Sequence, residues 1–192
     1  VSHMDHEPPV EGWDHSPFKG LVMGGWVSGC GVQDGKGSIA TMLMATMALL
    51  QDRDLLLKGS IILAPLMGSK QANLGMRSLL GSGLRADWVI DVESTDLNII
   101  TTNGPSDKRL VRTLKKWHKR IERQQPLIAD GTALGQAAAG RISAQAGIPT
   151  VLYGPGDRQS FEVWPTANER IWIEDLHMAA GIIALTMKDL LS

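Results

Sequence analysis

The chain has 192 residues, of which 43% are hydrophobic, and its 19 basic and 20 acidic residues give a formal net charge of -1. Such a length and apolar content allow one packed core, so we expect residues 1–192 to form a single domain. The near-neutral charge predicts no general attraction to nucleic acid or to a membrane. The single cysteine, Cys30, excludes an internal disulfide and predicts a cytoplasmic location. No apolar run is long enough for a membrane helix.

Strand-like and helix-like segments alternate along the chain, which predicts an α/β fold with a mostly parallel, mixed sheet and helices on both faces. The expected strands are 59–66, 88–92, 97–101 and 150–153. The expected helices are 36–51, 73–82, 107–124, 132–146 and 173–191. The first and last helices carry apolar residues almost all round, which is typical of buried helices.

The residues best suited to bind a metal ion lie near the amino end. His3 and Asp5 are two positions apart, so at a strand end they share a face and the carboxylate can orient a metal-bound imidazole. Asp34 lies in a glycine-rich turn before the first helix, where it could bridge two cations. Two plainer interpretations remain: a surface hydrogen bond between His3 and Asp5, or the remnant of a purification tag at Ser2-His3-Met4.

Several further segments follow this motif in a recognisable order. They are Pro8-Pro9, Trp13, Ser16-Pro17-Phe18, the glycine-rich run 24–37, Gly75-Met76-Arg77, Glu93-Ser94-Thr95, Gly147-Ile148-Pro149, Tyr153-Gly154-Pro155-Gly156 and Asn168-Glu169-Arg170. Over most of its length the chain resembles the zinc-dependent aminoacylase and carboxypeptidase family of metallopeptidases, which includes acetylornithine deacetylase, succinyl-diaminopimelate desuccinylase and glutamate carboxypeptidase.

The resemblance implies an α/β three-layer sandwich that hydrolyses amide bonds in N-acyl amino acids or dipeptides with the help of zinc. It places His3, Asp34 and Glu93 as ligands of one zinc ion, with Asp34 as the bridging carboxylate and Asp5 as the residue that orients His3. A histidine with carboxylates suits a zinc ion that keeps one position open for water.

The same resemblance places substituted residues at the other half of the site. Ser69 stands where the family has its general base, and a neutral hydroxyl does not accept a proton from water near neutral pH as a carboxylate does. Lys70 and Pro165 stand where the second metal would find a glutamate and a histidine. We therefore expect one zinc site at most, and we hypothesise that the Lys70 ammonium compensates the charge of the missing second zinc.

The family's separate lid and dimerisation domain has no counterpart near 102–107, where Asn103-Gly104-Pro105-Ser106 form a turn-like segment. The elements that precede the His-x-Asp strand in the family are also missing from the sequence. Because the lid often provides the dimer contact in the family, we expect a monomer, or a dimer formed through a surface that the family does not use.

These observations predict a hydrolase-family scaffold with weak or no activity, in effect a possible pseudoenzyme. The alternatives are a non-catalytic binding or structural protein and an engineered minimal core on the same scaffold. Segment 108–123 holds eight of the 19 basic residues at helical spacing, so we expect an amphipathic helix with a solvated basic face; an anion or nucleic-acid contact is the other interpretation.

Overall fold

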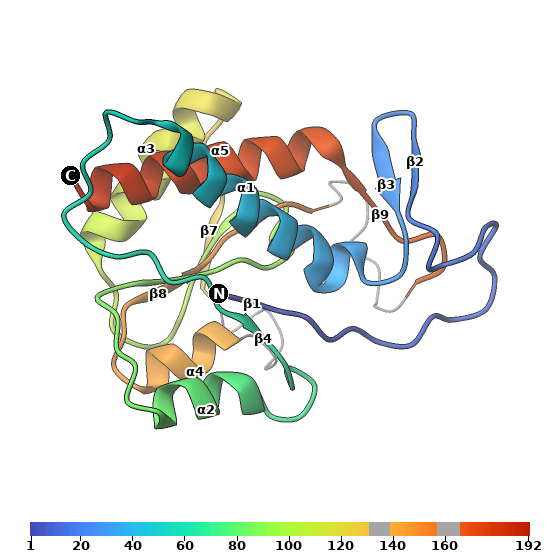
Figure 1. Ribbon diagram of the computed structural model, residues 1–192, viewed down its shortest axis with the longest axis horizontal. Helices are drawn as coiled ribbons and strands as arrows, with labels where there is room; N and C mark the ends of the chain where they lie inside the picture. Colours follow the sequence, from blue (N-terminus) through green and yellow to red (C-terminus); the bar gives the residue numbers. More distant parts are fainter. Residues whose placement is uncertain (131–138, 157–165) are drawn as a thin grey trace.

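The computed structural model describes residues 1–130, 139–156 and 166–192, and they form a mixed α/β fold (Figure 1). The strands are β1 (Ser2–His3), β2 (Leu21–Met23), β3 (Trp26–Ser28), β4 (Pro65–Leu66), β5 (Val89–Asp91), β6 (Ile99–Thr101), β7 (Ile128–Asp130), β8 (Thr150–Leu152) and β9 (Arg170–Trp172). The helices are the π-helical turn η1 (Val32–Lys36), α1 (Gly37–Gln51), α2 (Leu74–Gly81), α3 (Lys108–Glu122), α4 (Ala139–Gln145) and α5 (Ile173–Leu190).

The described strands form three hydrogen-bonded groups. The largest has the order β5-β8-β6-β7, in which β5 runs parallel to β8 and β6 parallel to β7, while β6 and β8 are antiparallel. Strands β1 and β4 form a short parallel pair, and β2, β3 and β9 form an antiparallel group. Val1 joins the first two groups, because its amino group donates to the Ile90 carbonyl and its own carbonyl accepts from the Val92 N–H.

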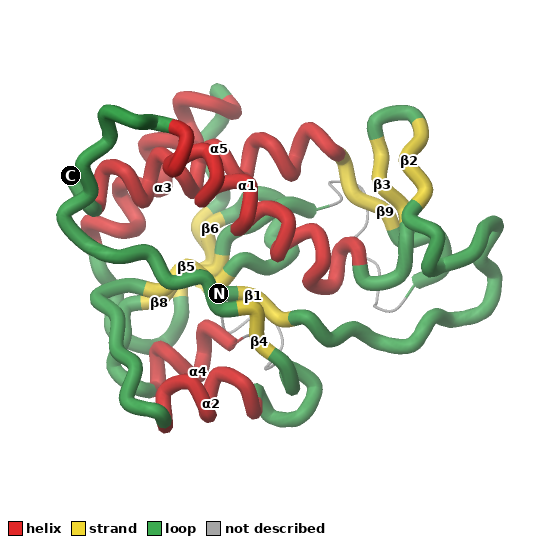
Figure 2. Tube along the Cα trace, viewed as in Figure 1, coloured by secondary structure: helices red, strands yellow, loops and turns green. Residues whose placement is uncertain are grey.

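The helices gather on opposite sides of the central strands. Helices α1, α3 and α5 lie together on one side, and α2 and α4 lie on the other (Figures 1 and 2). The main core lies under α1, α3 and α5 and contains the fully buried Ile99, Leu110, Leu114, Tyr153 and Ile182. A smaller apolar cluster, centred on the buried Met76, lies between α2 and α4.

Helix α3 shows how the sequence specifies one of these elements. Leu110 and Leu114 are four residues apart, so both project from one face into the core, while the basic residues occupy the solvent face. Asp107 caps the amino end, since its side chain accepts from the N–H groups of Arg109 and Leu110 at 2.6 and 3.2 Å. None of the helices in the described part of the chain has the length and apolar character needed to cross a bilayer.

The α/β class and the helices predicted at 36–51, 73–82, 107–124 and 173–191 are confirmed within one or two residues. Residues 132–138 of the helix predicted at 132–146 lie outside the described residues. The strand predicted at 59–66 is wrong except at Pro65–Leu66, and the hairpin β2–β3, β7 and β9 were not anticipated. Helix α1 is also not buried all round, because Met47 and Leu50 on it are 57% and 78% exposed.

Candidate metal centre

His3 lies at the carboxyl end of β1 and is the central residue of a group of charged side chains. Its imidazole is buried, and its Nδ1 lies 2.6 Å from the backbone oxygen of Asp5. Because a carbonyl only accepts, Nδ1 carries the proton of this bond. The other ring nitrogen, Nε2, therefore faces away from Asp5, toward two carboxylates.

The two carboxylates come from different parts of the chain. Asp34 Oδ1 lies 3.5 Å from His3 Nε2, and Glu93 Oε2 lies 3.4 Å from the same nitrogen. Asp34 is held in the turn η1, and Glu93 follows the end of β5 by two residues. Strands β1 and β5 are neighbours through Val1, so the two strand ends bring His3 and Glu93 to the same edge.

The charges around His3 raise its affinity for a proton. Burial alone would lower the pKa of the imidazole, but a hydrogen bond to Glu93 and the negative charges of Glu93 and Asp34 outweigh burial and raise the pKa to about 9. The protonated ring is thus a cation between two carboxylates near neutral pH. A metal ion at this position must displace that proton before Nε2 can bind it.

The turn that carries Asp34 depends on a glycine. Gly35 has a backbone φ of 127°, which residues with a Cβ rarely adopt. A Cβ added to Gly35 would also lie only 2.6 Å from the backbone oxygen of His3. The absence of a side chain at Gly35 therefore lets the turn approach His3 closely enough for Asp34 to face the imidazole.

Glu169, which precedes β9, fixes the same turn from the opposite end of the chain. Its buried carboxylate accepts from the N–H groups of Gly31, Gln33 and Asp34 at 2.9, 2.5 and 3.3 Å. Burial raises the pKa of Glu169 despite these bonds, which act in the opposite direction. No role for Glu169 is predicted from the sequence. A carboxylate that accepts from backbone N–H groups of a distant segment produces no recognisable pattern in the sequence around it.

Asp5, Ser69 and Lys70 form the wall beside His3. The Asp5 carboxylate accepts from the N–H groups of Ser69 and Lys70 at 3.3 and 3.2 Å, and it lies 3.8 Å from His3 Nδ1. The close contact between Asp5 and His3 thus involves the Asp5 backbone oxygen. The backbone bonds from Ser69 and Lys70 lower the pKa of Asp5 although burial acts to raise it.

The ammonium of Lys70 points into the acidic group. Its Nζ lies 3.5 Å from Asp34 Oδ2 and 3.6 Å from Glu7 Oε1. Asp34 therefore lies between two cationic groups, His3 on one oxygen and Lys70 on the other. Burial still raises the pKa of Asp34 above its usual value. Pro165, the last of the predicted site positions, lies outside the described residues.

The donor atoms can be tested against the geometry of zinc. Two ligands of one tetrahedral zinc ion lie roughly 3.3 Å apart, given metal–ligand distances of about 2.0–2.2 Å. The distances from His3 Nε2 to Asp34 and Glu93 are close to that value, and Glu93 Oε1 is buried without a hydrogen-bond partner among the described residues. Nevertheless, no group of three or more histidine, cysteine or acidic side chains in the described part is arranged to hold a metal ion. The donor types and pair distances fit zinc, but the complete ligand set is not formed.

The sequence pattern of Peptidase family M20/M25/M40 matches residues 1–96, which include His3, Asp34, Ser69, Lys70 and Glu93. The chain belongs to this family. The match covers half of the chain and ends just after Glu93. It supports the metal-dependent hydrolase scaffold that the sequence predicts.

Curated proteins similar to this family member are enzymes that remove acyl groups. An N-formyl-4-amino-5-aminomethyl-2-methylpyrimidine deformylase of Bacillus subtilis is 30% identical over 94 residues, which are 49% of this chain and 22% of the relative. A succinyl-diaminopimelate desuccinylase of Methylorubrum extorquens is 48% identical over 52 residues, 26% of this chain and 14% of the relative. The matched segments thus span less than a quarter of either relative.

Solved structures support the fold over a longer part of the M20 chain. A crystal structure of LapA from Legionella superposes with a TM-score of 0.63 at 12% identity and covers 84% of this chain and 48% of LapA. An M18-family aminopeptidase from Thermotoga maritima has a TM-score of 0.54 at 12% identity and covers 88% of this chain and 47% of that one. At these identities the likeness concerns the fold alone, and this chain spans about half of each structure.

Proposed function

We propose that this chain is an M20-family scaffold for amide hydrolysis of N-acyl amino acids or dipeptides, with catalysis impaired by residues of its own site. In this proposal residues 1–192 form one catalytic-type domain with a three-layer arrangement. The protein is a monomer and is located in the cytoplasm. The observation that carries the proposal is the position of the Lys70 ammonium, 3.5 Å from the Asp34 oxygen that faces away from His3.

The position of Lys70 matters because of charge. Two cations a few ångströms apart repel each other, by about 4 kcal/mol at 4 Å for unit charges in a partly screened site. A divalent ion on the outer oxygen of Asp34 would meet this repulsion from Lys70 and would also lack the glutamate that the family resemblance places at this position. We therefore assign Lys70 as an electrostatic substitute for a second zinc.

His3, Asp34 and Glu93 would hold the remaining zinc ion, and Asp5 would hold the His3 ring through its backbone oxygen. A zinc bound there would supply a Lewis acid and a water of lowered pKa. Ser69, at the position of the general base, has a hydroxyl that cannot accept the proton of that water as a carboxylate does. The proposal therefore separates binding of one metal from efficient turnover.

One observation favours a second candidate, a binding or structural protein without a metal. The His3 imidazolium and the Lys70 ammonium together neutralise much of the negative charge of Asp34 and Glu93. The acidic group is thus compensated by the chain itself. A scaffold of this kind needs no zinc for the folded state.

Zinc titration tests the metal assignment. We expect the purified chain to bind no more than one equivalent, measured by calorimetry and by elemental analysis after dialysis. Lys70→Glu should raise zinc affinity about tenfold or more, since it removes the repelling cation and adds a ligand. Lys115→Glu, which makes the same charge change on the exposed face of α3, should leave zinc binding unchanged. Two equivalents bound to the unmodified chain would overturn the assignment of Lys70.

A panel of N-acetyl and N-succinyl amino acids with added zinc tests the activity. We expect hydrolysis by the unmodified chain to be at or near background. The combined change Ser69→Glu, Lys70→Glu and Pro165→His restores the family's residues at the positions assigned above, and it should increase both zinc stoichiometry and hydrolysis. If neither increases in a variant that keeps its circular dichroism spectrum, the assignment of these three positions is wrong.

A further inference from the structure

Helix α3 and its carboxyl-terminal cap carry a row of cations that the rest of the described fold does not use. The row recurs every three or four positions, so its four helical members lie within an arc of about 60° on one side of the helix. All five side chains are exposed, and no ion pair among the described residues involves them. This row, which we call the outer stripe, consists of Lys108, Arg112, Lys115, Lys119 and Arg123.

The neighbouring row of cations on α3 has a structural task. Arg109 donates to the backbone oxygen of Asp189 in α5 at 3.1 Å, and Lys116 Nζ lies 2.6 Å from the Asp189 carboxylate. Lys116 and Arg120 also lie over the ring of Trp117, at 4.5 and 5.5 Å from its centroid. These three cations hold α3 in the fold, whereas the outer stripe faces solvent.

The outer stripe lowers the stability of the helix that carries it. Like charges three or four positions apart on a helix repel each other, and every pair of neighbours in the stripe is of this kind. The acidic residues of segment 107–123 are Asp107 and Glu122. The Asp107 carboxylate already accepts from two backbone N–H groups and from the Trp88 indole. An anionic partner would remove the repulsion that the chain itself leaves in place.

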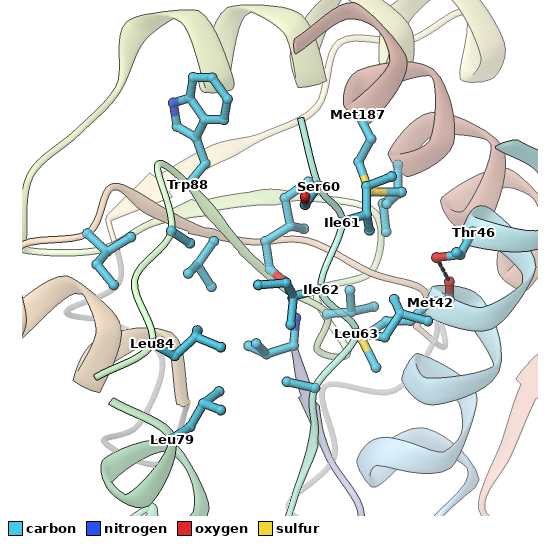
Figure 3. A pocket seen from close by; sticks show the side chains of 18 of the residues that line it. Met42, Thr46, Ser60, Ile61, Ile62, Leu63, Leu79, Leu84, Trp88 and Met187 are labelled. Atoms are coloured by element: carbon cyan, nitrogen blue, oxygen red, sulfur yellow. Dashed lines mark hydrogen bonds between the residues drawn. The ribbon is translucent and has the colours of Figure 1, made fainter. Parts of the chain in front are cut away.

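Helix α3 is fixed in position near both ends. The Trp88 indole donates to Asp107 at 2.6 Å, and it points away from the apolar pocket that it borders and toward the start of α3 (Figure 3). In the second half of the helix, Lys116 and Trp117 donate to the Asp189 carboxylate at 2.6 and 2.9 Å. A charged surface that is already ordered loses little conformational entropy when a partner binds.

The surface around the outer stripe offers charge without exposed apolar groups. The large apolar side chains of α3 are all buried or partly buried, namely Leu110, Val111, Leu114, Trp117 and Ile121. Helices that bind the surface of a bilayer use apolar side chains as well as charge. Single-stranded nucleic acid is bound largely by stacking of its bases on aromatic rings, and two cations already lie over the Trp117 ring. These observations favour a partner that is held by charge alone.

The dimensions of the outer stripe fit the phosphates of a DNA duplex. From residue 108 to residue 123 the helix advances about 22 Å, at 1.5 Å per residue. A duplex presents about 13 phosphates over that length. A helix with its side chains is about 10–12 Å across, and the major groove of B-DNA, about 12 Å wide, admits it. The major groove of duplex RNA is too narrow for side chains to enter.

We propose that the outer stripe of α3 is a docking surface for double-stranded DNA, which binds through its phosphates with little dependence on base sequence. Phosphate contacts position a protein on DNA but carry no sequence information. The near-neutral net charge of the chain gives no long-range attraction. Charges act over a Debye length of about 8 Å at physiological ionic strength, however, so the local excess of cations governs the contact. This inference does not depend on the proposed hydrolase function.

Fluorescence anisotropy of a labelled DNA duplex of mixed sequence, titrated with the full chain at several salt concentrations, tests the proposal. Five phosphate contacts predict a slope of about -4.5 in log K against log salt concentration, since each contact contributes about -0.9. The combined change Arg112→Ala, Lys115→Ala and Lys119→Ala should reduce the slope to about -1.8 and weaken binding about tenfold or more at low salt.

This triple variant should fold normally, because alanine favours a helix and the change removes like-charge repulsion. Its circular dichroism spectrum and melting temperature check this. The matched control combines Lys19→Ala, Arg53→Ala and Lys58→Ala, which removes three exposed cations from other segments. The control should leave the salt slope unchanged and the affinity within about twofold, since these cations lie outside the outer stripe. Equal weakening by the two variants would overturn the proposal, because net charge alone would then explain binding.

Other polyanions separate DNA from its competitors. The same titration is repeated with duplex RNA and with single-stranded DNA of the same sequence, and with vesicles rich in phosphatidylserine. We expect the DNA duplex to bind most tightly at each salt concentration. Tighter binding of any of the other three would overturn the choice of partner. A dissociation constant above about 1 mM for the DNA duplex at low salt would overturn the docking surface itself, since non-specific DNA binding is ordinarily stronger.

Discussion

Gly35 lies where the turn η1 passes under the backbone oxygen of His3, and its positive φ and missing side chain both serve that approach. We expect Gly35→Ala to lower the free energy of unfolding by about 2 kcal/mol or more, because left-handed backbone alone costs roughly 1–2 kcal/mol and the new Cβ would also collide with His3. Urea denaturation measures the loss.

Gly81, at the end of α2, provides the matched control for Gly35→Ala. A Cβ at Gly81 meets no atom within 4 Å, and the residue is helical. Gly81→Ala should therefore leave stability unchanged or raise it by up to about 1 kcal/mol. Equal losses in the two variants would contradict the role given to Gly35.

Glu169 is the second residue that fixes the turn, through three backbone N–H groups. In Glu169→Gln the side chain keeps its shape, but it loses one acceptor oxygen and presents an NH₂ donor to a backbone donor. We expect a loss of about 1–3 kcal/mol in the free energy of unfolding, the usual effect of leaving buried donors unpaired. Chemical denaturation checks it, with Glu11→Gln on an exposed loop as the variant that should show no change.

At the scale of elements, helix α3 depends on its amino-terminal cap. Asp107 accepts from two N–H groups of the first turn and from the Trp88 indole at 2.6 Å, so one carboxylate joins the start of α3 to the segment before β5. Asp107→Ala should destabilise the fold by about 1 kcal/mol through loss of the cap, with a further loss because the Trp88 indole N–H loses its acceptor. Thermal unfolding measures this effect; Asp87→Ala, on an exposed residue, should shift the melting temperature by much less.

At the scale of the whole molecule, Asp189 joins α5 to α3 and makes stability depend on pH. Burial acts to raise the pKa of its carboxyl, but hydrogen bonds from Lys116 and Trp117 outweigh burial and lower it. A lowered pKa in the folded state gives stability that is present above the unfolded value of 3.8 and is lost as pH falls through the folded value.

Asp189→Asn should therefore reduce the free energy of unfolding near neutral pH, and the difference from the unmodified chain should shrink as pH falls below about 4. Urea denaturation at a series of pH values gives both curves. Asp91, whose pKa burial raises to about 7, acts in the opposite direction but is present in both proteins, so it cancels in the comparison. A difference that stays constant down to pH 3 would contradict this account of Asp189.

The helices could be predicted from the sequence because their signals are local. Leu110 and Leu114 fall on one face, and Asp107 marks the start of α3. Residues 60–64 have an equally strong strand pattern, but a strand forms only when a neighbouring segment offers backbone partners. The sequence of a strand does not predict whether a segment with free backbone partners lies beside it in the fold.

The candidate site was predictable to a similar extent. The His-x-Asp spacing and the glycine-rich turn indicated His3 and Asp34, and the structure places these two side chains 3.5 Å apart. Lys70 was expected near Asp34, and its ammonium lies 3.5 Å from that carboxylate. The support from Glu169 could not be predicted, because its partners are backbone groups more than 130 residues away.

That separation has a consequence for the order in which the molecule matures. As the chain leaves the ribosome, His3 and Asp34 emerge long before Glu169, so the N–H groups of Gly31, Gln33 and Asp34 have no acceptor until Glu169 has been synthesised. Contacts so distant in sequence form slowly, since a long loop must close first. The turn beside His3 therefore forms its stabilising hydrogen bonds long after its own residues are made, and a ribosome-bound chain that ends before residue 169 has Asp34 in a turn without these bonds.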